Sequence, residues 1–203
     1  MRRSVDTAAA DTLRVHHLLD ASRANGPGLR AVVWVQGCGR DCPGCFNPET
    51  HDPAGGDELT HAGILAWWAR VATGVDGLTV SGGEPLEQAA ALSRVLEAAR
   101  AAADLPVLLF TGWTWAEVQA STEAAACVDL VDAVMLGPYV QELAGGAGPW
   151  GSSNQELRLL SPRLAGADFD ALPAAEVVVG ADGCLIVTGT DPPAGLGAAH
   201  GTP

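Results

Sequence analysis

Residues 29–47 read LRAVVWVQGCGRDCPGCFN, an apolar run that leads directly into three closely spaced cysteines. The run over residues 29–35 is rich in β-branched side chains, which predicts a buried strand of a parallel sheet. Pro43 and Gly44 are turn-forming residues, which argues against a packed core segment here. The cysteines have the spacing C-x3-C-x2-C and are Cys38, Cys42 and Cys45. The sequence therefore predicts a thiol-rich loop at the end of a buried strand.

Strand and helix patterns alternate along the following part of the chain. The expected strands, after a short strand or turn at 13–19 and the strand at 29–35, cover 77–80, 106–110, part of 130–136 and 156–160. The expected helices cover 60–72, 86–103 and 115–126. This alternation is typical of βαβ units and a parallel sheet. Parallel sheets bind ligands at the carboxyl ends of their strands, so we expect the loops 36–47 and 81–85 to lie on the same edge.

The C-terminal part of the sequence has a different pattern. Two β-rich segments, 176–179 and 184–187, flank a glycine-containing turn and predict a hairpin. We expect a main domain over residues 13–189, preceded by a flexible arm at 1–12. The Pro-, Gly- and Ala-rich residues 190–203 predict a disordered tail.

Composition restricts the classes of function. The formal net charge of −13 argues against sequence-independent nucleic-acid binding, which depends on basic side chains. No apolar run approaches the roughly 18 residues of a membrane helix, and no apolar signal core follows the basic N-terminus. We therefore expect a cytoplasmic protein with no membrane partner. In a reducing compartment, clustered cysteines indicate metal binding or chemistry rather than disulfides.

Three closely spaced thiolates are suited to one soft metal centre. Thiolates select zinc, copper(I) or iron–sulfur clusters. A structural zinc site takes a fourth protein ligand, and the candidates Cys127, Cys184 and His51 all lack paired spacing. A four-iron cluster normally takes four cysteines, so three leave one iron open to a ligand. An open site indicates catalysis, while zinc or three metal-free thiols remain the alternatives.

The segment Ser81-Gly82-Gly83-Glu84-Pro85 lies between an expected strand and an expected helix. Two glycines allow the backbone to approach a ligand closely, and a helix N-terminus offers free N–H groups. The carboxylate of Glu84 can accept hydrogen bonds from an ammonium group. By itself the segment is equally compatible with a plain strand-to-helix turn.

The two cysteines outside the loop, Cys127 and Cys184, are interpreted as small buried apolar residues.

The cysteine loop followed by Phe46, together with Gly82-Gly83-Glu84, resembles the radical S-adenosylmethionine (SAM) superfamily. Further segments resemble the activating-protein family of anaerobic (class III) ribonucleotide reductases. These segments are 26–30, 36–38, 42–50, 110–114, 137–139 and 151–155. The resemblance extends over about residues 13–160. It implies an α/β fold, a partial (βα) barrel with mostly parallel strands, to which the predicted C-terminal hairpin is added.

The resemblance also implies a chemistry. Cys38, Cys42 and Cys45 would hold a [4Fe-4S] cluster, and SAM would bind the open iron through its amino and carboxylate groups. Reductive cleavage of SAM would give a 5′-deoxyadenosyl radical, which abstracts a hydrogen atom from a glycine of a partner glycyl-radical enzyme such as an anaerobic ribonucleotide reductase. A flavodoxin- or ferredoxin-type protein would supply the electron. The implied SAM contacts are Gly44 and Phe46 on the adenine side and Ser81, Gly82, Gly83 and Glu84 on the methionine side.

Three positions depart from the family pattern. Leu136, Trp150 and Glu156 stand where family members carry an acidic residue, an arginine and a basic residue. These departures suggest an alternative, a radical SAM enzyme that modifies a peptide or a small molecule. A third hypothesis, from a different class, is a zinc- or cluster-binding interaction module without catalysis.

Overall fold

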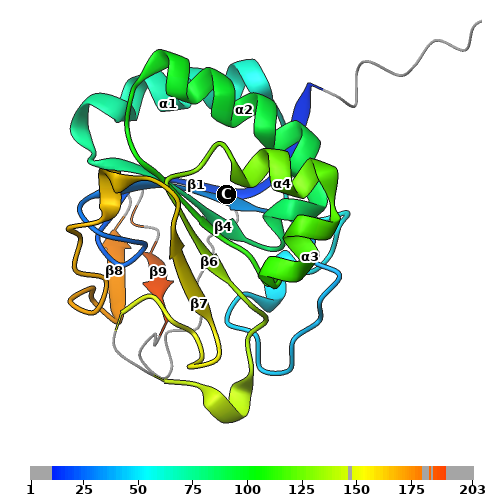
Figure 1. Cartoon of the computed structure of the whole chain (residues 1–203). Helices are drawn as coiled ribbons and strands as arrows, with labels where there is room; N and C mark the ends of the chain where they lie inside the picture. Colours follow the sequence, from blue (N-terminus) through cyan, green and yellow to red (C-terminus); the bar gives the residue numbers. More distant parts are fainter. Residues whose placement is uncertain (1–10, 146–147, 180–182, 184, 191–203) are drawn as a thin grey trace, which may run out of the picture.

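The computed structural model describes residues 11–145, 148–179, 183 and 185–190. Its central feature is a seven-stranded sheet of order β3-β1-β2-β4-β5-β6-β7 (Figure 1). Strands β2, β4, β5 and β6 run parallel to one another. Strand β1 pairs antiparallel with β2, β3 pairs antiparallel with β1, and β7 pairs antiparallel with β6. The strands are β1 (Thr12–Ser22), β2 (Arg30–Val35), β3 (Asp57–Thr60), β4 (Gly77–Gly82), β5 (Val107–Phe110), β6 (Ala133–Leu136) and β7 (Glu156–Leu159).

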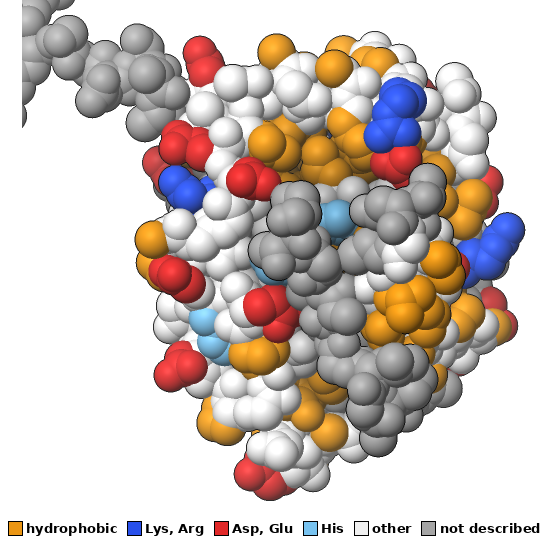
Figure 2. All heavy atoms as spheres, turned by 180° about the vertical axis from the view of Figure 1, so that it is seen from behind, with side chains coloured by type: hydrophobic (Ala, Val, Ile, Leu, Met, Phe, Trp, Pro, Cys, Tyr) orange, Lys and Arg blue, Asp and Glu red, His pale blue; other side chains and the backbone are white. Residues whose placement is uncertain are grey.

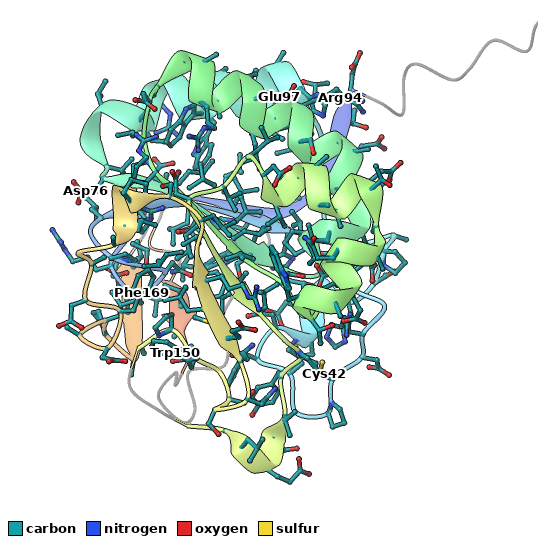
Figure 3. The ribbon with its side chains drawn as sticks, in the orientation of Figure 1. Cys42, Asp76, Arg94, Glu97, Trp150 and Phe169 are labelled. Atoms are coloured by element: carbon teal, nitrogen blue, oxygen red, sulfur yellow. The ribbon has the colours of Figure 1, made fainter. Side chains whose placement is uncertain are left out.

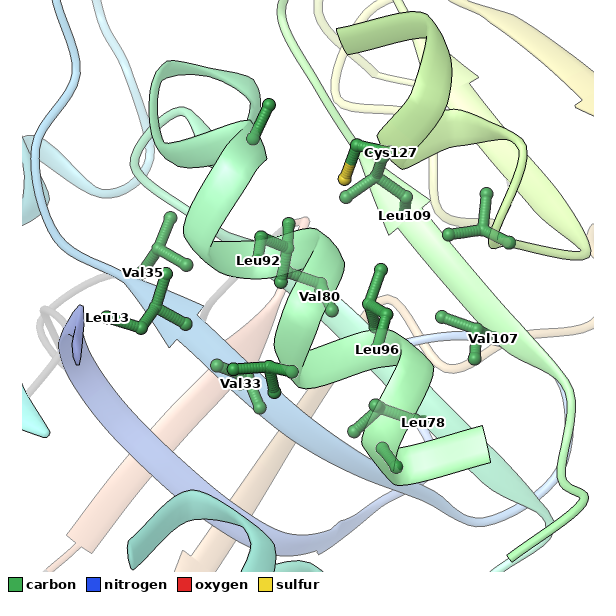
Figure 4. Packing of buried hydrophobic residues seen from close by; sticks show 14 of the residues in the cluster. Leu13, Val33, Val35, Leu78, Val80, Leu92, Leu96, Val107, Leu109 and Cys127 are labelled. Carbon is green, nitrogen blue, oxygen red and sulfur yellow. The ribbon is translucent and has the colours of Figure 1, made fainter. Parts of the chain in front are cut away.

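Four α-helices pack on one face of this sheet (Figure 1). They are α1 (His61–Val71), α2 (Ala89–Ala102), α3 (Trp115–Ala120) and α4 (Thr122–Val128). Short 3-10 helices are η2 (Pro48–Thr50), η3 (Ala72–Gly74), η4 (Pro85–Gln88), η5 (Gln141–Leu143) and η6 (Pro162–Leu164). The apolar stripe of α2, which includes Leu92 and Leu96, packs on Val33, Val80 and Leu109 of the strands (Figure 4). The apolar residues of this stripe repeat at helical spacing, so they lie on one face of α2, and that face is buried against the sheet.

The opposite face of the sheet is covered by the C-terminal part of the chain. Strands β8 (Ala175–Val179) and β9 (Leu185–Gly189) form a separate antiparallel hairpin beside the sheet, on the side away from the helices (Figure 1). Its Val178 and Ile186 pack against Leu19, Val32 and Trp34. Because side chains alternate along a strand, Val32 and Trp34 face the hairpin while their neighbours face the helices.

The amino-terminal end of the parallel strands is held by buried charges. The Asp132 side chain, 1% exposed, accepts hydrogen bonds from the Val107 backbone N–H (2.8 Å), Arg100 (2.9 Å) and the Ser161 hydroxyl (2.6 Å). These donors hold the pKa of Asp132 below its usual value, although burial opposes them. Buried Arg30 donates to the carbonyls of residues 78 and 106. Figure 3 shows Asp76 at this end and Cys42 at the opposite end.

The structure confirms the α/β class, the mostly parallel central sheet and the C-terminal hairpin. It does not confirm a barrel, because no hydrogen-bonded ladder among the described residues joins β3 to β7. One expected helix, 115–126, is wrong as a single element. Ser121 separates α3 from α4 because it adopts an extended backbone, and its hydroxyl caps α4 by accepting from the Ala124 N–H.

Some segments form more regular structure than the sequence predicted, and others lie outside the described residues. The segment expected as a short strand or turn at 13–19 is part of an eleven-residue strand, β1. Between the cysteine loop and α1 the chain forms η2 and then β3, which pairs with β1. The predicted arm up to residue 10, the centre of the hairpin turn, Cys184 and the predicted tail from residue 191 lie outside the described residues.

The surface is acidic in keeping with the net charge. Figure 2 views the molecule from behind and shows acidic side chains scattered over this face, with few Lys or Arg side chains. Within the part of the chain that the structure describes, every helix is too short or too polar to cross a membrane.

Candidate metal centre

The cysteine loop and the Gly-Gly-Glu loop follow two neighbouring parallel strands. Trp34 of β2 pairs with Ser81 of β4, and Val35 pairs with Gly82, so both strands end at the same edge of the sheet. The two loops lie on the same edge, as the sequence predicted, and both line one pocket there. The predicted site residues that line it are Cys38, Cys42, Cys45, Phe46, Ser81, Gly82, Gly83 and Glu84.

The two loops are joined by backbone hydrogen bonds. The Gly83 N–H donates to the Val35 carbonyl (2.9 Å), and the Glu84 N–H donates to the Gly37 carbonyl (2.8 Å). A Cβ atom on Gly83 would lie only 2.3 Å from the Gly37 oxygen. Gly82 has φ +99°, which side chains disfavour. Both glycines are therefore required for the close approach of the two loops.

The cysteine loop is also tied to the segment that follows it. The Gly37 N–H donates to the Thr50 carbonyl (2.8 Å), and the Cys38 N–H donates to the His51 carbonyl (3.2 Å). The loop reverses direction with φ +46° at Asp41 and +70° at Gly44. These bonds and turns hold the three thiols around the pocket without a disulfide.

The three thiols are half-buried, and those of Cys38 and Cys45 receive backbone N–H groups. Burial raises the pKa of Cys38, and the backbone N–H groups of Arg40 and Asp41 partly oppose that effect. Burial likewise raises the pKa of Cys45, whose sulfur accepts a long hydrogen bond of 3.5 Å from the Asn47 N–H. N–H donors directed at sulfur stabilise a thiolate ligand and tune the potential of an iron–sulfur cluster.

The three thiols of the loop line one pocket, as the ligands of a shared cluster would. Within the described residues, no group of three or more Cys, His, Asp or Glu side chains is arranged to hold one metal ion. A [4Fe-4S] cluster binds each thiolate at a different iron, so its ligands need not converge on one point. Of the candidate fourth zinc ligands, Cys127 is buried in the core against the helices. His51 lines the pocket, and Cys184 lies outside the described residues.

Glu84 is a buried carboxylate at the floor of the pocket, 1% exposed. Its Oε1 accepts from the Thr111 hydroxyl (2.7 Å) and the Leu86 N–H (2.9 Å), and its Oε2 accepts from the Gly112 N–H (2.8 Å). Burial raises the pKa of Glu84 to about 7, against the opposing effect of these donors. Glu84 therefore braces the loop after β4 against the loop after β5, and its oxygens keep further lone pairs for a ligand.

The aromatic side of the pocket is formed by Phe46 and Tyr139, with ring centroids 4.6 Å apart. Gly151 lies against Phe46, since a Cβ there would be 2.6 Å from that ring. Gly44 is not among the pocket-lining residues, and it packs instead against the Gln141 side chain. Gly44 thus shapes the cysteine loop from outside the pocket.

Sequence reasoning missed one wall of the pocket. His16, Asn25 and Trp34 line it from β1, the turn after it and β2. Residues 187–190 line it from the C-terminal hairpin. The β-branched pattern of residues 29–35 predicted a strand with two buried faces, which indicated that something covers the second face. Nothing local indicated that the hairpin does so.

Arg40, within the cysteine loop, connects the site to α3. Its Nη2 donates to Glu117 Oε1 at 2.7 Å. In the capping box of α3, the Glu117 N–H donates to the Thr114 hydroxyl oxygen (3.3 Å), and the Thr114 N–H donates to the other carboxylate oxygen of Glu117 (2.6 Å). This carboxylate oxygen also accepts from the Thr114 hydroxyl (2.8 Å). These donors lower the pKa of Glu117 to about 2. The first turn of α3 therefore fixes one end of the thiol loop.

The family is settled by comparison of the sequence with known proteins. The profile of the family described as "4Fe-4S single cluster domain" matches residues 24–158. The chain belongs to this iron–sulfur family. The match includes all three cysteines of the loop and the Gly-Gly-Glu segment, and it ends before the hairpin β8–β9. Family membership supports an iron–sulfur cluster in this chain.

Relatives of this iron–sulfur protein are activating enzymes. It is 31% identical over 150 residues to the anaerobic ribonucleoside-triphosphate reductase-activating protein of Vibrio cholerae, covering 70% of this chain and 96% of that protein. The protein of the same name from Escherichia coli K12 is 30% identical with the same coverage. The pyruvate formate-lyase-activating enzyme of Clostridium pasteurianum is 41% identical over 88 residues, 41% of this chain and 37% of that enzyme. The prediction of a radical SAM enzyme of the activase type is confirmed.

Proposed function

We propose that this enzyme cleaves SAM reductively and removes a hydrogen atom from a glycine of a partner polypeptide. One observation carries the proposal: three unpaired cysteines and the Gly-Gly-Glu loop line a single pocket at the carboxyl ends of parallel strands. Cys38, Cys42 and Cys45 would hold a [4Fe-4S] cluster. With three protein ligands, one iron keeps a position open for SAM.

The bound cluster would supply the electron that splits SAM into methionine and a 5′-deoxyadenosyl radical. The chain's own residues bind and orient SAM. Gly82 and Gly83 line the part of the pocket where the methionine portion would lie, and Glu84 is placed to accept from its ammonium group. Phe46 and Tyr139 offer an aromatic surface on which an adenine ring stacks.

We also propose that the fold is a partial (βα) barrel. Four parallel strands with helices on one face support an assignment to the partial (βα) barrel of the radical SAM type. The face away from the helices would be the interior of that barrel. In this chain the C-terminal segment occupies part of that face.

The proposed partner is a glycyl-radical enzyme such as an anaerobic ribonucleotide reductase, and the proposed electron donor is a flavodoxin or ferredoxin. The names of the relatives support a glycyl-radical enzyme as the partner. A second candidate, modification of another peptide, is favoured by Trp150, which stands where the family carries an arginine. Trp150 packs with Phe169 of the C-terminal segment, so this wall differs from the family pattern (Figure 3).

The cluster is tested by anaerobic reconstitution followed by iron and sulfide analysis and visible absorption. We expect about four irons per chain in the wild-type protein. Substituting any of the loop cysteines, for example Cys42→Ala, should abolish the cluster, whereas Cys127→Ala serves as the matched control and should retain it. Stoichiometric zinc without iron would contradict the proposal.

The reaction is tested by adding SAM and dithionite to the reconstituted enzyme and measuring 5′-deoxyadenosine and methionine by mass spectrometry. Addition of a candidate glycyl-radical protein should then give a glycyl radical detectable by electron paramagnetic resonance. If 5′-deoxyadenosine forms but none of the candidate reductases or lyases acquires the radical, the second candidate is favoured.

A further inference from the structure

One edge of the C-terminal hairpin lines the candidate active-site pocket. Val187, Thr188, Gly189 and Thr190 are consecutive residues at the end of β9, and all four line the pocket that the cysteines line. No residue of β8 does so. A run of consecutive lining residues indicates that the strand presents its edge, because a strand that presents a face contributes every second residue.

The pairing of the hairpin shows which backbone groups this edge offers. The Thr190 N–H donates to the Ala174 carbonyl (2.8 Å), and Ala175 pairs with Gly189. In an antiparallel ladder, hydrogen-bonded pairs alternate with pairs whose backbone groups point outward. The N–H and C=O groups of Val187 and Leu185, which pair with Val177 and Val179, therefore point away from β8. Within the described residues, no strand pairs with this second edge of β9.

The hairpin is fixed to the end of β1, to the turn that follows it, and to β2, the strand that carries the cysteine loop. Glu176 of β8 accepts from the Ser22 hydroxyl (2.6 Å) and the Arg23 N–H (2.8 Å). Asn25 donates to the Thr188 hydroxyl at 2.8 Å. Ile186 packs with Trp34 of β2, two residues before that loop begins at Gln36. The edge of β9 is thus held at a set position relative to the thiols.

We propose that the outward edge of β9 binds the substrate as an extended polypeptide segment, which adds as a further strand and carries its glycine over the cysteine loop. The inference rests on the proposed function and goes beyond it, because it assigns a binding mode to a hairpin outside the family match. Unpaired strand edges recognise extended peptides through backbone hydrogen bonds, which a compact small molecule does not reproduce. A glycine presents its Cα hydrogens without a Cβ.

The chemistry then balances within the pocket. One Cα–H bond of the glycine breaks, one C–H bond forms in 5′-deoxyadenosine, and the unpaired electron moves to the glycine Cα. No oxidant or reductant is needed for this transfer beyond the radical that the proposed function supplies.

Two proline substitutions test whether the part of the β9 edge that lines the pocket binds the peptide, by comparison with a part of the same edge outside the pocket. Val187 and Leu185 both occupy outward-pointing positions of β9, opposite Val177 and Val179. Proline at either removes an outward N–H without removing a bond to β8, and edge strands tolerate such prolines. Only Val187 lines the pocket. Val187→Pro is therefore the test variant, and Leu185→Pro is its matched control.

The probe is a pool of nine-residue peptides with a central glycine dideuterated at Cα and randomised flanks. Reconstituted enzyme, SAM and dithionite are mixed with the pool, and deuterium in 5′-deoxyadenosine is measured by mass spectrometry. We expect labelled product from the wild type and from Leu185→Pro. In Val187→Pro the labelled fraction of the 5′-deoxyadenosine should fall about tenfold, the effect of one lost hydrogen bond of about 1.4 kcal/mol.

A binding measurement that needs no turnover accompanies this assay. Hydrogen exchange of residues 185–189 should slow when the peptide pool is added to the wild-type protein. N-methylation of the peptide at successive positions should weaken that protection with a period of two, as an added strand requires. This series uses the wild-type enzyme, so it decides the binding mode even if Val187→Pro fails to fold.

The outcomes distinguish the two proposals. If the wild type forms no 5′-deoxyadenosine, the proposed function fails, and protection of residues 185–189 by peptide still supports binding at the edge. If 5′-deoxyadenosine forms but stays unlabelled and β9 gains no protection, the peptide inference is overturned. Equal label and protection in Val187→Pro and wild type, or N-methyl effects without a period of two, would overturn the edge-binding mode.

Discussion

The buried carboxyl group of Glu84 makes the stability of the protein depend on pH. Its pKa is about 7 in the folded protein, against an ordinary value of 4.5, because burial disfavours its charged form. This difference of about 2.5 pH units corresponds to roughly 3 kcal/mol. The folded state binds this proton more tightly than the unfolded state. The contribution is therefore fully present below pH 4.5 and is lost as the pH rises towards 7.

The perturbation is Glu84→Gln, which keeps the shape of the side chain and removes its titration. We expect the free energy of unfolding of the wild type to fall by about 3 kcal/mol relative to this variant between pH 4.5 and 8. The assay is urea denaturation of the cluster-free protein with a thiol reductant, followed by circular dichroism across this range. The same comparison with Glu123→Gln, exposed on α4, measures what a surface carboxyl contributes.

A constant difference between wild type and Glu84→Gln at all pH values would refute this reasoning. So would a nuclear magnetic resonance titration that places the carboxyl of Glu84 near its ordinary pKa. Either result would mean that the donors from Thr111, Leu86 and Gly112 outweigh burial. The charged form would then be the one that the folded protein prefers at neutral pH.

Three further predictions concern the core, the loop contact and the amino-terminal anchor. Leu96→Ala, at a fully buried position, should lower the free energy of unfolding by about 2–5 kcal/mol in urea denaturation. Gly83→Ala should lower the melting temperature and the iron content after reconstitution because its Cβ meets a carbonyl, whereas Gly74→Ala, which meets open space, should change neither. Asp132→Asn should destabilise the protein by about 1–3 kcal/mol, as measured by urea denaturation, because it weakens hydrogen bonds to Arg100 and others. Its rate of 5′-deoxyadenosine formation at a permissive temperature should equal that of the wild type.

The parts of the fold with a strong local pattern could be predicted from sequence. The β-branched run of residues 29–35 became β2, and the stripe of Leu92 and Leu96 became the buried face of α2. The shared edge for the two motif loops followed from the rule that parallel strands end on one side. Each of these inferences depends on neighbours in sequence or on a general rule of chain topology.

The remaining features depend on contacts between distant segments. The antiparallel direction of β1 and β7 is set by pairing, which no local pattern encodes. The short strand β3 forms because it pairs with β1, although its residues other than Leu59 are polar. Neither the burial of Glu84 nor the place of the hairpin at the pocket could be inferred, since both require the three-dimensional arrangement of several loops.

The anchor at Asp132 and Arg30 has a consequence for how the protein tolerates change. This anchor secures the amino ends of the strands, while the thiols and the Gly-Gly-Glu loop occupy the other end of the sheet (Figure 3). The residues that stabilise the fold are thus distinct from the residues that line the reactive pocket, as in other sheets with active sites at the carboxyl ends of parallel strands. Loops on the reactive side can vary, and new partners can be acquired, while the scaffold beneath them keeps its stability.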